Sequence, residues 1–232
     1  MNDGPYVTRV SAWAPGMENS GDWDEWAQGK RDIAADGKGP AITFTDSMFR
    51  RRLSQISKMT IQVVHDLLPV GEDTKIFFVS FRGELSRQYQ ITMMLVEQNA
   101  LMPAAFSLSV FNAPPALASI ALGLKGGYSA LYPGNNSFSS GLAAAEAAFL
   151  SGTQDELIFV YADEQAPPEY GSLFTECPAC LAFGLLLTRK PQPGGESRSA
   201  IPLSSLNKRE DSPSDFLRRL LLCGKIHVSH FD

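Results

Sequence analysis

The turn at residues 132–137, YPGNNS, occupies a position where many α/β enzymes place a nucleophile, between a short apolar segment and an alanine-rich segment. A nucleophile there would be a thiol or hydroxyl at the tip of the following helix, where the helix dipole stabilises a developing negative charge. Asn135 and Asn136 stand at this tip, and the asparagine amide is a poor nucleophile. Ser137 has a hydroxyl, but no base is found near it in the sequence. Residue chemistry alone therefore favours a tight turn with Ser137 as the helix N-cap.

A second set of reactive side chains combines Cys177 and Cys180 with Cys223 and His227 near the C-terminus. Three thiolates and one imidazole suit a Cys3His zinc site. The spacing from Cys223 to His227 is not that of a common zinc knuckle, and Cys180 begins an apolar segment in which cysteine serves as a small core residue. We therefore expect that these residues bind no metal, and a zinc site remains an alternative.

Charge and composition narrow the classes of function. The chain has 232 residues, 44% of them hydrophobic, and a formal net charge of −5, which disfavours nucleic acid and anionic membranes as partners. The basic run at residues 50–52 reads as a solvated helix end. No glycine-rich phosphate-binding motif is present, so we expect no nucleotide and no other cofactor. The absence of a signal peptide or membrane span and the presence of three cysteines indicate a reducing, cytoplasmic setting.

The expected elements alternate between strands and helices. Five apolar segments are predicted as strands, at residues 6–15, 74–80, 128–132, 156–163 and 179–190. Helices are expected from Asp46 or Ser47 through residue 68, over residues 86–99 and 113–124, after Ser137, and after Ser212 or Ser214. Residues 16–40 are interpreted as a polar insertion. The order predicts a largely parallel sheet with helices on both faces.

Three stretches, at residues 50–68, 77–91 and 103–152, resemble the N-terminal half of a β-ketoacyl synthase. The nearest resemblance is to short ketosynthase-like subunits of the chain-length-factor type, found in aryl-polyene and related polyketide clusters. The run at residues 106–126 is the most specific part. The resemblance implies the N-terminal half of a thiolase-like fold, layered α/β/α with a mixed, mostly parallel five-stranded sheet. It covers residues 1–190, and residues 191–232 are expected to form a Pro/Gly/Ser-rich loop with a C-terminal helix and tail.

The resemblance also assigns positions to functional residues. It places Asn135 where an active synthase has its nucleophilic cysteine, and it puts the family's two catalytic histidines in a C-terminal half that would begin near Asp232. It implies that strand 128–132 pairs with its counterpart across a dimer axis and that residues 106–112 lie along an acyl tunnel. Phe111 stands where relatives often have histidine. The interface and tunnel candidates are Phe106, Val110, Phe111, Asn112, Tyr128, Ser129, Ala130, Leu131, Tyr132, Asn135, Asn136 and Phe138.

The expected function follows from this resemblance. It is a non-catalytic subunit, a chain length factor, that forms a heterodimer with an active β-ketoacyl synthase and shapes its acyl tunnel in fatty-acid or polyketide-type (aryl polyene) biosynthesis. An acyl carrier protein would be met indirectly, through that partner. Two alternatives remain: a stand-alone acyl-handling enzyme that uses Ser137 or a cysteine, and a zinc-stabilised binding module that uses Cys177, Cys180 and Cys223.

Overall fold

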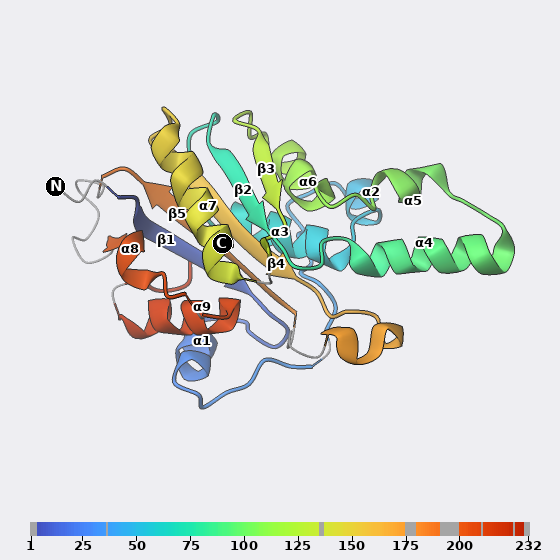
Figure 1. Ribbon diagram of the computed structural model, residues 1–232, viewed down its shortest axis with the longest axis horizontal. Helices are drawn as coiled ribbons and strands as arrows, with labels where there is room; N and C mark the ends of the chain where they lie inside the picture. The colour runs from blue at the N-terminus through green and yellow to red at the C-terminus, as the bar shows by residue number, and fades with distance from the viewer. Residues whose placement is uncertain are drawn as a thin grey trace.

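A six-stranded sheet, in the order β3-β2-β4-β5-β1-β6, forms the centre of the molecule (Figure 1). The computed structural model describes residues 4–35, 37–134, 137–174, 180–190, 200–209, 211–224 and 226–229. The strands are β1 (Tyr6–Trp13), β2 (Lys75–Val79), β3 (Tyr128–Leu131), β4 (Glu156–Asp163), β5 (Leu181–Thr188) and β6 (Ile201–Pro202). The five predicted strands are confirmed, and β6 is an additional short one.

The sheet is mixed, as expected, but antiparallel pairs outnumber parallel ones. Strand β2 runs parallel to β3 and β4, whereas β4–β5, β5–β1 and β1–β6 are antiparallel. The prediction of a mostly parallel sheet was therefore wrong for the β4–β5–β1 side. The reason is that β5 follows β4 without a helix crossing over the sheet, and such a connection returns the chain antiparallel.

Helices α7 (Phe138–Ser151), α8 (Leu203–Leu206) and α9 (Pro213–Leu222) cover one face of the sheet, and α1 (Ser20–Ala27) packs against α9 (Figure 1). Ser137 caps α7 as predicted, because its hydroxyl accepts the amide N–H of Ser140 at 3.3 Å. The apolar stripe of α7 is buried against the sheet, and α8 and α9 pack into the same core. Residues beyond 200 thus share the core of the preceding chain.

Helices α3 (Gln55–His65) and α6 (Ala113–Leu122) cover the opposite face. The prediction of one continuous helix from Asp46 to residue 68 was wrong. Asp46 caps only the short helix α2 (Ser47–Arg50), and Ser54 caps α3 by accepting the amide N–H of Ser57 at 3.1 Å. A serine with extended backbone at this position satisfies the first amides of a new helix and so separates the two.

Helices α1 and α9 both begin with a capping box. Helix α1 lies within the segment interpreted as an insertion, and Asn19 and Asp22 form a capping box at its start. Ser212, one of the two predicted caps, starts α9 through a capping box with Asp215. Within the described ranges, no helix has both the length and the apolar character that crossing a bilayer requires.

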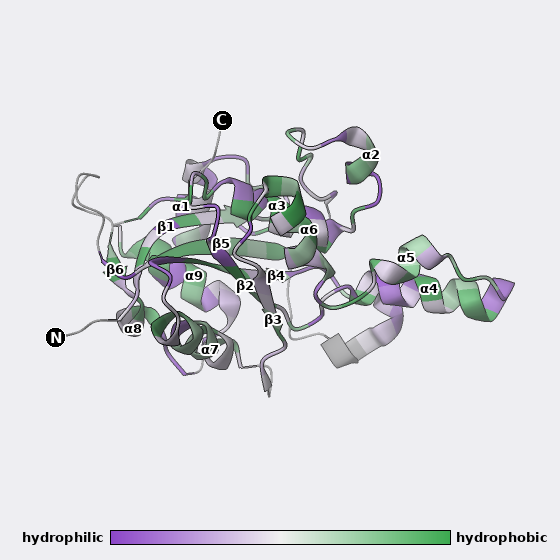
Figure 2. Ribbon diagram, turned by 90° about the horizontal axis from the view of Figure 1, so that it is seen from above, coloured by the Kyte–Doolittle hydropathy of each residue, from purple (hydrophilic) through white to green (hydrophobic). Residues whose placement is uncertain are grey.

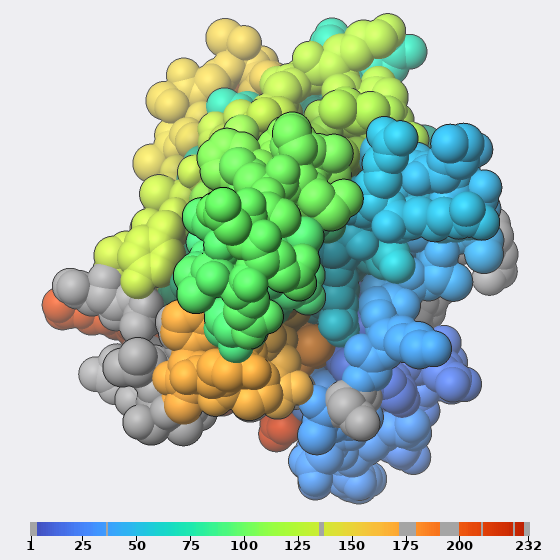
Figure 3. Space-filling view, turned by 90° about the vertical axis from the view of Figure 1, so that its right-hand side faces the viewer, coloured from blue at the N-terminus to red at the C-terminus, as the bar shows by residue number. Residues whose placement is uncertain are grey.

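Helices α4 (Leu85–Gln98) and α5 (Pro103–Ser107) project sideways from the body (Figures 1 and 2). We call residues 85–107 the arm. Neither of its helices contains a buried residue. The 3-10 segment η2 (Pro168–Phe174) lies beside the base of α4, where the rings of Tyr89 and Tyr170 stand 5.8 Å apart (Figure 3). The arm therefore contacts the rest of the protein mainly at its base.

Candidate functional site

Strand β3 forms one edge of the sheet. It pairs with β2 through four register positions, from Ile76–Tyr128 to Val79–Leu131, and no other strand of the described chain pairs with it. Ser129, Ala130 and Leu131 are half-buried, whereas Tyr128 and Tyr132 at its ends are exposed. An unpaired edge leaves backbone N–H and C=O groups available for another strand.

The segment before α6 lies beside this edge. Asn112 Nδ2 donates to the hydroxyl of Tyr128 at 3.2 Å, which ties the segment to the start of β3. Phe111 is half-buried, with its ring centroid 6.1 Å from that of Phe78 in β2. Val110 remains exposed. The structure thus brings the predicted residues Val110, Phe111 and Asn112 together with the predicted strand.

The arm carries several exposed apolar side chains. Val96 is 74% exposed, and Phe106, which the sequence also predicted, is 56% exposed. Arg87 and Glu97 are the only charged residues among the 23 positions 85–107. Interfaces are depleted in charge and enriched in methionine and aromatic residues, so this composition is typical of a buried interface. The exposed large hydrophobic residues from the arm to β3 are Leu95, Val96, Leu101, Met102, Phe106, Val110, Ile120, Tyr128 and Tyr132.

A buried carboxylate fixes the turn from which the arm starts. Asp163, at the end of β4, accepts hydrogen bonds from the hydroxyls of Ser80 and Tyr161, both at 2.7 Å. It also accepts the amides of Phe81 and Arg82, both at 3.0 Å. Burial raises the pKa of Asp163, while the hydrogen bonds from Ser80, Phe81 and Tyr161 and the charge of Arg82 oppose the rise. Asp163 therefore clamps the β2–α4 turn to the centre of the sheet.

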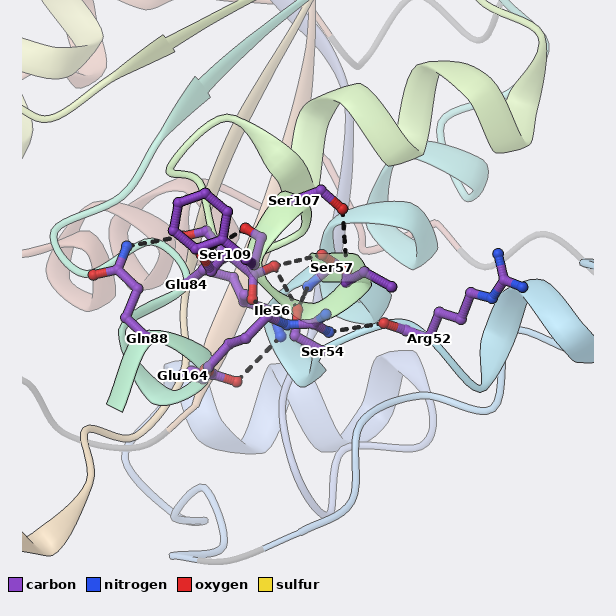
Figure 4. A network of polar contacts seen from close by, with 12 residues as sticks. Arg52, Ser54, Ile56, Ser57, Glu84, Gln88, Ser107, Ser109 and Glu164 are labelled. Atoms are coloured by element: carbon purple, nitrogen blue, oxygen red, sulfur yellow. Dashed lines mark hydrogen bonds and ion pairs between the residues drawn. The ribbon is translucent and has the colours of Figure 1, made fainter. Parts of the chain in front are cut away.

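Glu84 fastens the base of α4 to α3 (Figure 4). Its Oε1 accepts the hydroxyls of Ser54 at 2.6 Å and Ser57 at 2.8 Å. On the next turn, Gln88 Nε2 donates to the carbonyl of Ser109 at 2.9 Å, so α4 is also held to the segment before α6. These hydrogen bonds therefore connect the base of the arm both to α3 and to the segment before α6. Sequence reasoning missed them, because no local pattern marks Glu84 as a buried residue.

Cys180 and Cys223 are not brought together. Cys180 packs on the α3 face of the sheet, where its Sγ accepts Gln55 Nε2 and the amide of Gln165, both at 3.4 Å. Cys223 lies exposed at the end of α9, which covers the other face. Burial raises the pKa of the Cys180 thiol, which disfavours the thiolate that zinc requires. The part of the chain that the structure describes contains no group of three metal-binding side chains; Cys177 falls outside it, and His227 lies 4.0 Å from Asp24.

Three predicted positions remain: Asn135, Asn136 and Phe138. Asn135 and Asn136 fall outside the described residues. Phe138, in contrast, was wrongly placed among the interface candidates, because it is only 1% exposed. Its ring lies 5.3–6.0 Å from those of Phe159, Tyr161, Phe183 and Phe216. Phe138 is the centre of an aromatic core.

Comparisons with known proteins agree with this geometry. The chain is similar to a solved structure of the ketosynthase ApeO in complex with its chain length factor ApeC from Xenorhabdus doucetiae, with a TM-score of 0.67 and 24% identity over 81% of this chain and 80% of that one. It is also similar to the ishigamide ketosynthase/chain length factor, with a TM-score of 0.64 and 13% identity over 84% of this chain and 64% of that one.

A third similar structure is the ketosynthase from module 1 of the bacillaene synthase of Bacillus amyloliquefaciens, with a TM-score of 0.56 and 15% identity over 81% of this chain and 42% of that one. These likenesses confirm the thiolase-like α/β fold. A comparison with curated protein sequences finds no match. The family model described as the N-terminal domain of β-ketoacyl synthase matches residues 23–222. The chain therefore belongs to the β-ketoacyl synthase family, as a member built on its N-terminal domain.

Proposed function

We propose that the chain is a non-catalytic, chain-length-factor-type subunit that forms a heterodimer with an active β-ketoacyl synthase. The arm is the observation that carries the proposal. Two short helices without a buried residue are marginal in water, because most helical stability in proteins comes from packing an apolar face. Exposed Val96, Met102 and Phe106 would find that packing on a partner.

Strand β3 supplies the second contact. Its free edge would pair antiparallel with the corresponding strand of the synthase and continue the sheet from one subunit into the other. Tyr128 and Tyr132, exposed at the two ends of the strand, would lie at this junction. Main-chain hydrogen bonds would set the register, and the arm would add apolar area.

The acyl chain would then pass between the two subunits. Phe106 lies at the end of the arm, and Phe111 and Asn112 lie between the arm and β3, where a bulky side chain sets how far a bound chain extends. Decarboxylative condensation of the acyl thioester with malonyl carrier protein would be performed by the synthase, and the carrier protein would dock on it. Asn135 at the nucleophile position supports a non-catalytic role.

Native mass measurement tests the pairing directly. The chain is expressed alone and together with a ketosynthase from the same gene cluster, and each sample is weighed by native mass spectrometry. We expect a one-to-one complex. A soluble monomer that forms no complex with the synthase would contradict the proposal.

Intact mass after incubation with an acyl thioester tests the non-catalytic role. We expect no covalent adduct on the chain itself and an acyl adduct on the synthase. An acyl group attached to Ser137 or to a cysteine of this chain would favour the stand-alone enzyme.

A further inference from the structure

Two carboxyl groups at the base of the arm are buried side by side against the first turn of α3. Glu84 is 0% exposed and Glu164 is 5% exposed. Glu84 Oε1 accepts the hydroxyls of Ser54 and Ser57, and Glu164 Oε2 accepts the amide of Ile56 at 3.2 Å (Figure 4). Since these three donors belong to one helical turn, they hold the two carboxyl groups next to each other.

Each carboxyl group leaves one oxygen without a hydrogen bond. Glu84 Oε2 and Glu164 Oε1 are buried and accept no hydrogen bond within the described ranges. The guanidinium of Arg87 provides the nearest charge, with Nε 3.3 Å from Glu84 Oε2. A buried carboxylate oxygen without a donor is costly, whereas a protonated carboxyl becomes a donor itself.

The other groups that face the pair offset the burial only in part: Arg87 acts on Glu84 and Ser86 on Glu164, and each lowers the pKa of its carboxyl group. Arg82, from the β2–α4 turn, directs Nη1 to the main-chain oxygen of Glu164 at 2.7 Å. Cys180 approaches from β5 and Ser86 from α4. Burial raises the pKa of Glu164 to about 7, with a smaller contribution in the same direction from the charge of Glu84. Burial also raises the pKa of Glu84, against the hydroxyls of Ser54 and Ser57.

We propose that Glu84 and Glu164 hold one proton between them near neutral pH, and that this proton fastens the base of the arm to helix α3. Opening of the base exposes both carboxyl groups to water, where each ionises freely. The closed base therefore binds one proton more than the open base over a range of pH. This device is a property of the chain alone and does not depend on a partner.

The direction of the pH effect follows from this difference. The ordinary pKa of glutamate is 4.5, and that of Glu164 in the closed base is about 7. Between these values each rise of one pH unit favours opening, by up to about tenfold for one proton. The stabilisation is complete below pH 4.5, falls as pH rises through that window, and changes no further above pH 7.

Hydrogen–deuterium exchange of the native chain at pH 5, 6, 7 and 8 tests the proposal, with rates corrected for intrinsic exchange. We expect protection of the peptides spanning residues 84–98 to fall several-fold per unit from pH 5 to 7 and then level off. Glu164→Gln keeps a neutral side chain at this position, so its protection should lose most of the dependence on pH. Glu97→Gln, which removes an exposed carboxylate from the same helix, should behave as the native chain does.

Two results would overturn the proposal. One is protection of residues 84–98 in the native chain that does not change between pH 5 and 7. The other is a Glu164→Gln variant that keeps the full pH dependence. Should Glu164→Gln fail to fold, Glu84→Gln serves instead: it removes the neighbouring charge, so the transition should move to lower pH, and an unmoved transition counts against a shared proton.

Discussion

Phe111 lies directly against Gly83: a methyl group at Gly83 would stand 2.5 Å from Cδ2 of the Phe111 ring. Gly83 also has a φ of +54°, which side chains other than glycine adopt at a cost. The contact joins the turn that starts the arm to the segment that leads into α6. One glycine thus lets two parts of the candidate interface approach each other.

Gly83→Ala should destabilise the chain for both reasons. The left-handed backbone and the displaced Phe111 ring together cost about 2–4 kcal/mol in the free energy of unfolding. Gly123→Ala is the matched control, because Gly123 has a φ of +68° but no atom within 4 Å of an added methyl group, so only the backbone cost of about 1–2 kcal/mol remains. Chemical denaturation measures both losses, and equal losses would contradict the role of Phe111.

Asp163→Asn should be strongly destabilising. The N–H of Phe81 binds Oδ2 and the N–H of Arg82 binds Oδ1, so replacing either oxygen by an NH2 group leaves one of these two donors without its acceptor. We expect a loss of about 2–4 kcal/mol. Asp155→Asn, whose side chain is 92% exposed, should change stability by less than about 0.5 kcal/mol. A comparable loss in the two variants would show that the clamp on the β2–α4 turn contributes little.

The strands and the helix caps could be predicted because their signals are local. Strands β4 and β5 are apolar runs covered on both faces, and Ser137 caps α7 from its own turn. The antiparallel direction of β5 relative to β4 could not be predicted from local signals, because it depends on the path by which the chain returns to the sheet. The break at Ser54 was missed because the apolar periodicity of α3 continues into the residues before it.

The candidate site was predictable only in part, for a similar reason. The edge position of β3 and the segment around Phe106 entered through a family resemblance; the structure has β3 at an edge of the sheet and Phe106 exposed. The pairing of Glu84 with Glu164 joins residues 80 positions apart, and no local pattern marks it. Phe138 was misassigned because an aromatic residue beside a turn suits either an interface or a core, and only packing decides.

Val96→Glu should weaken the pairing with the synthase without unfolding the chain. Val96 is 74% exposed on α4, so the free subunit tolerates a charge there, whereas a charge buried in the interface would cost about 2–4 kcal/mol, or roughly 30- to 800-fold in Kd. Leu222→Glu on α9, 59% exposed and away from the arm, is the matched control (Figure 1). Titration of each variant against the synthase measures Kd, and unchanged binding by Val96→Glu would exclude the arm as the interface.

Phe111→Ala should lengthen the products of the paired synthase. The ring fills space beside Phe78 and Gly83, so removing it opens room at the proposed tunnel while condensation, performed by the synthase, continues. Mass spectrometry of the released products should show a shift to chains longer by at least one extension unit.

Two variants separate a tunnel effect on product length from a loss of folding. Phe111→Leu keeps most of the volume and should shift the products less. Asn112→Ala removes the hydrogen bond to Tyr128 and leaves the ring in place, so it should not lengthen them. A folded Phe111→Ala complex with unchanged products would show that this side chain does not limit chain length, and the exposed Phe106 would then be the residue to truncate.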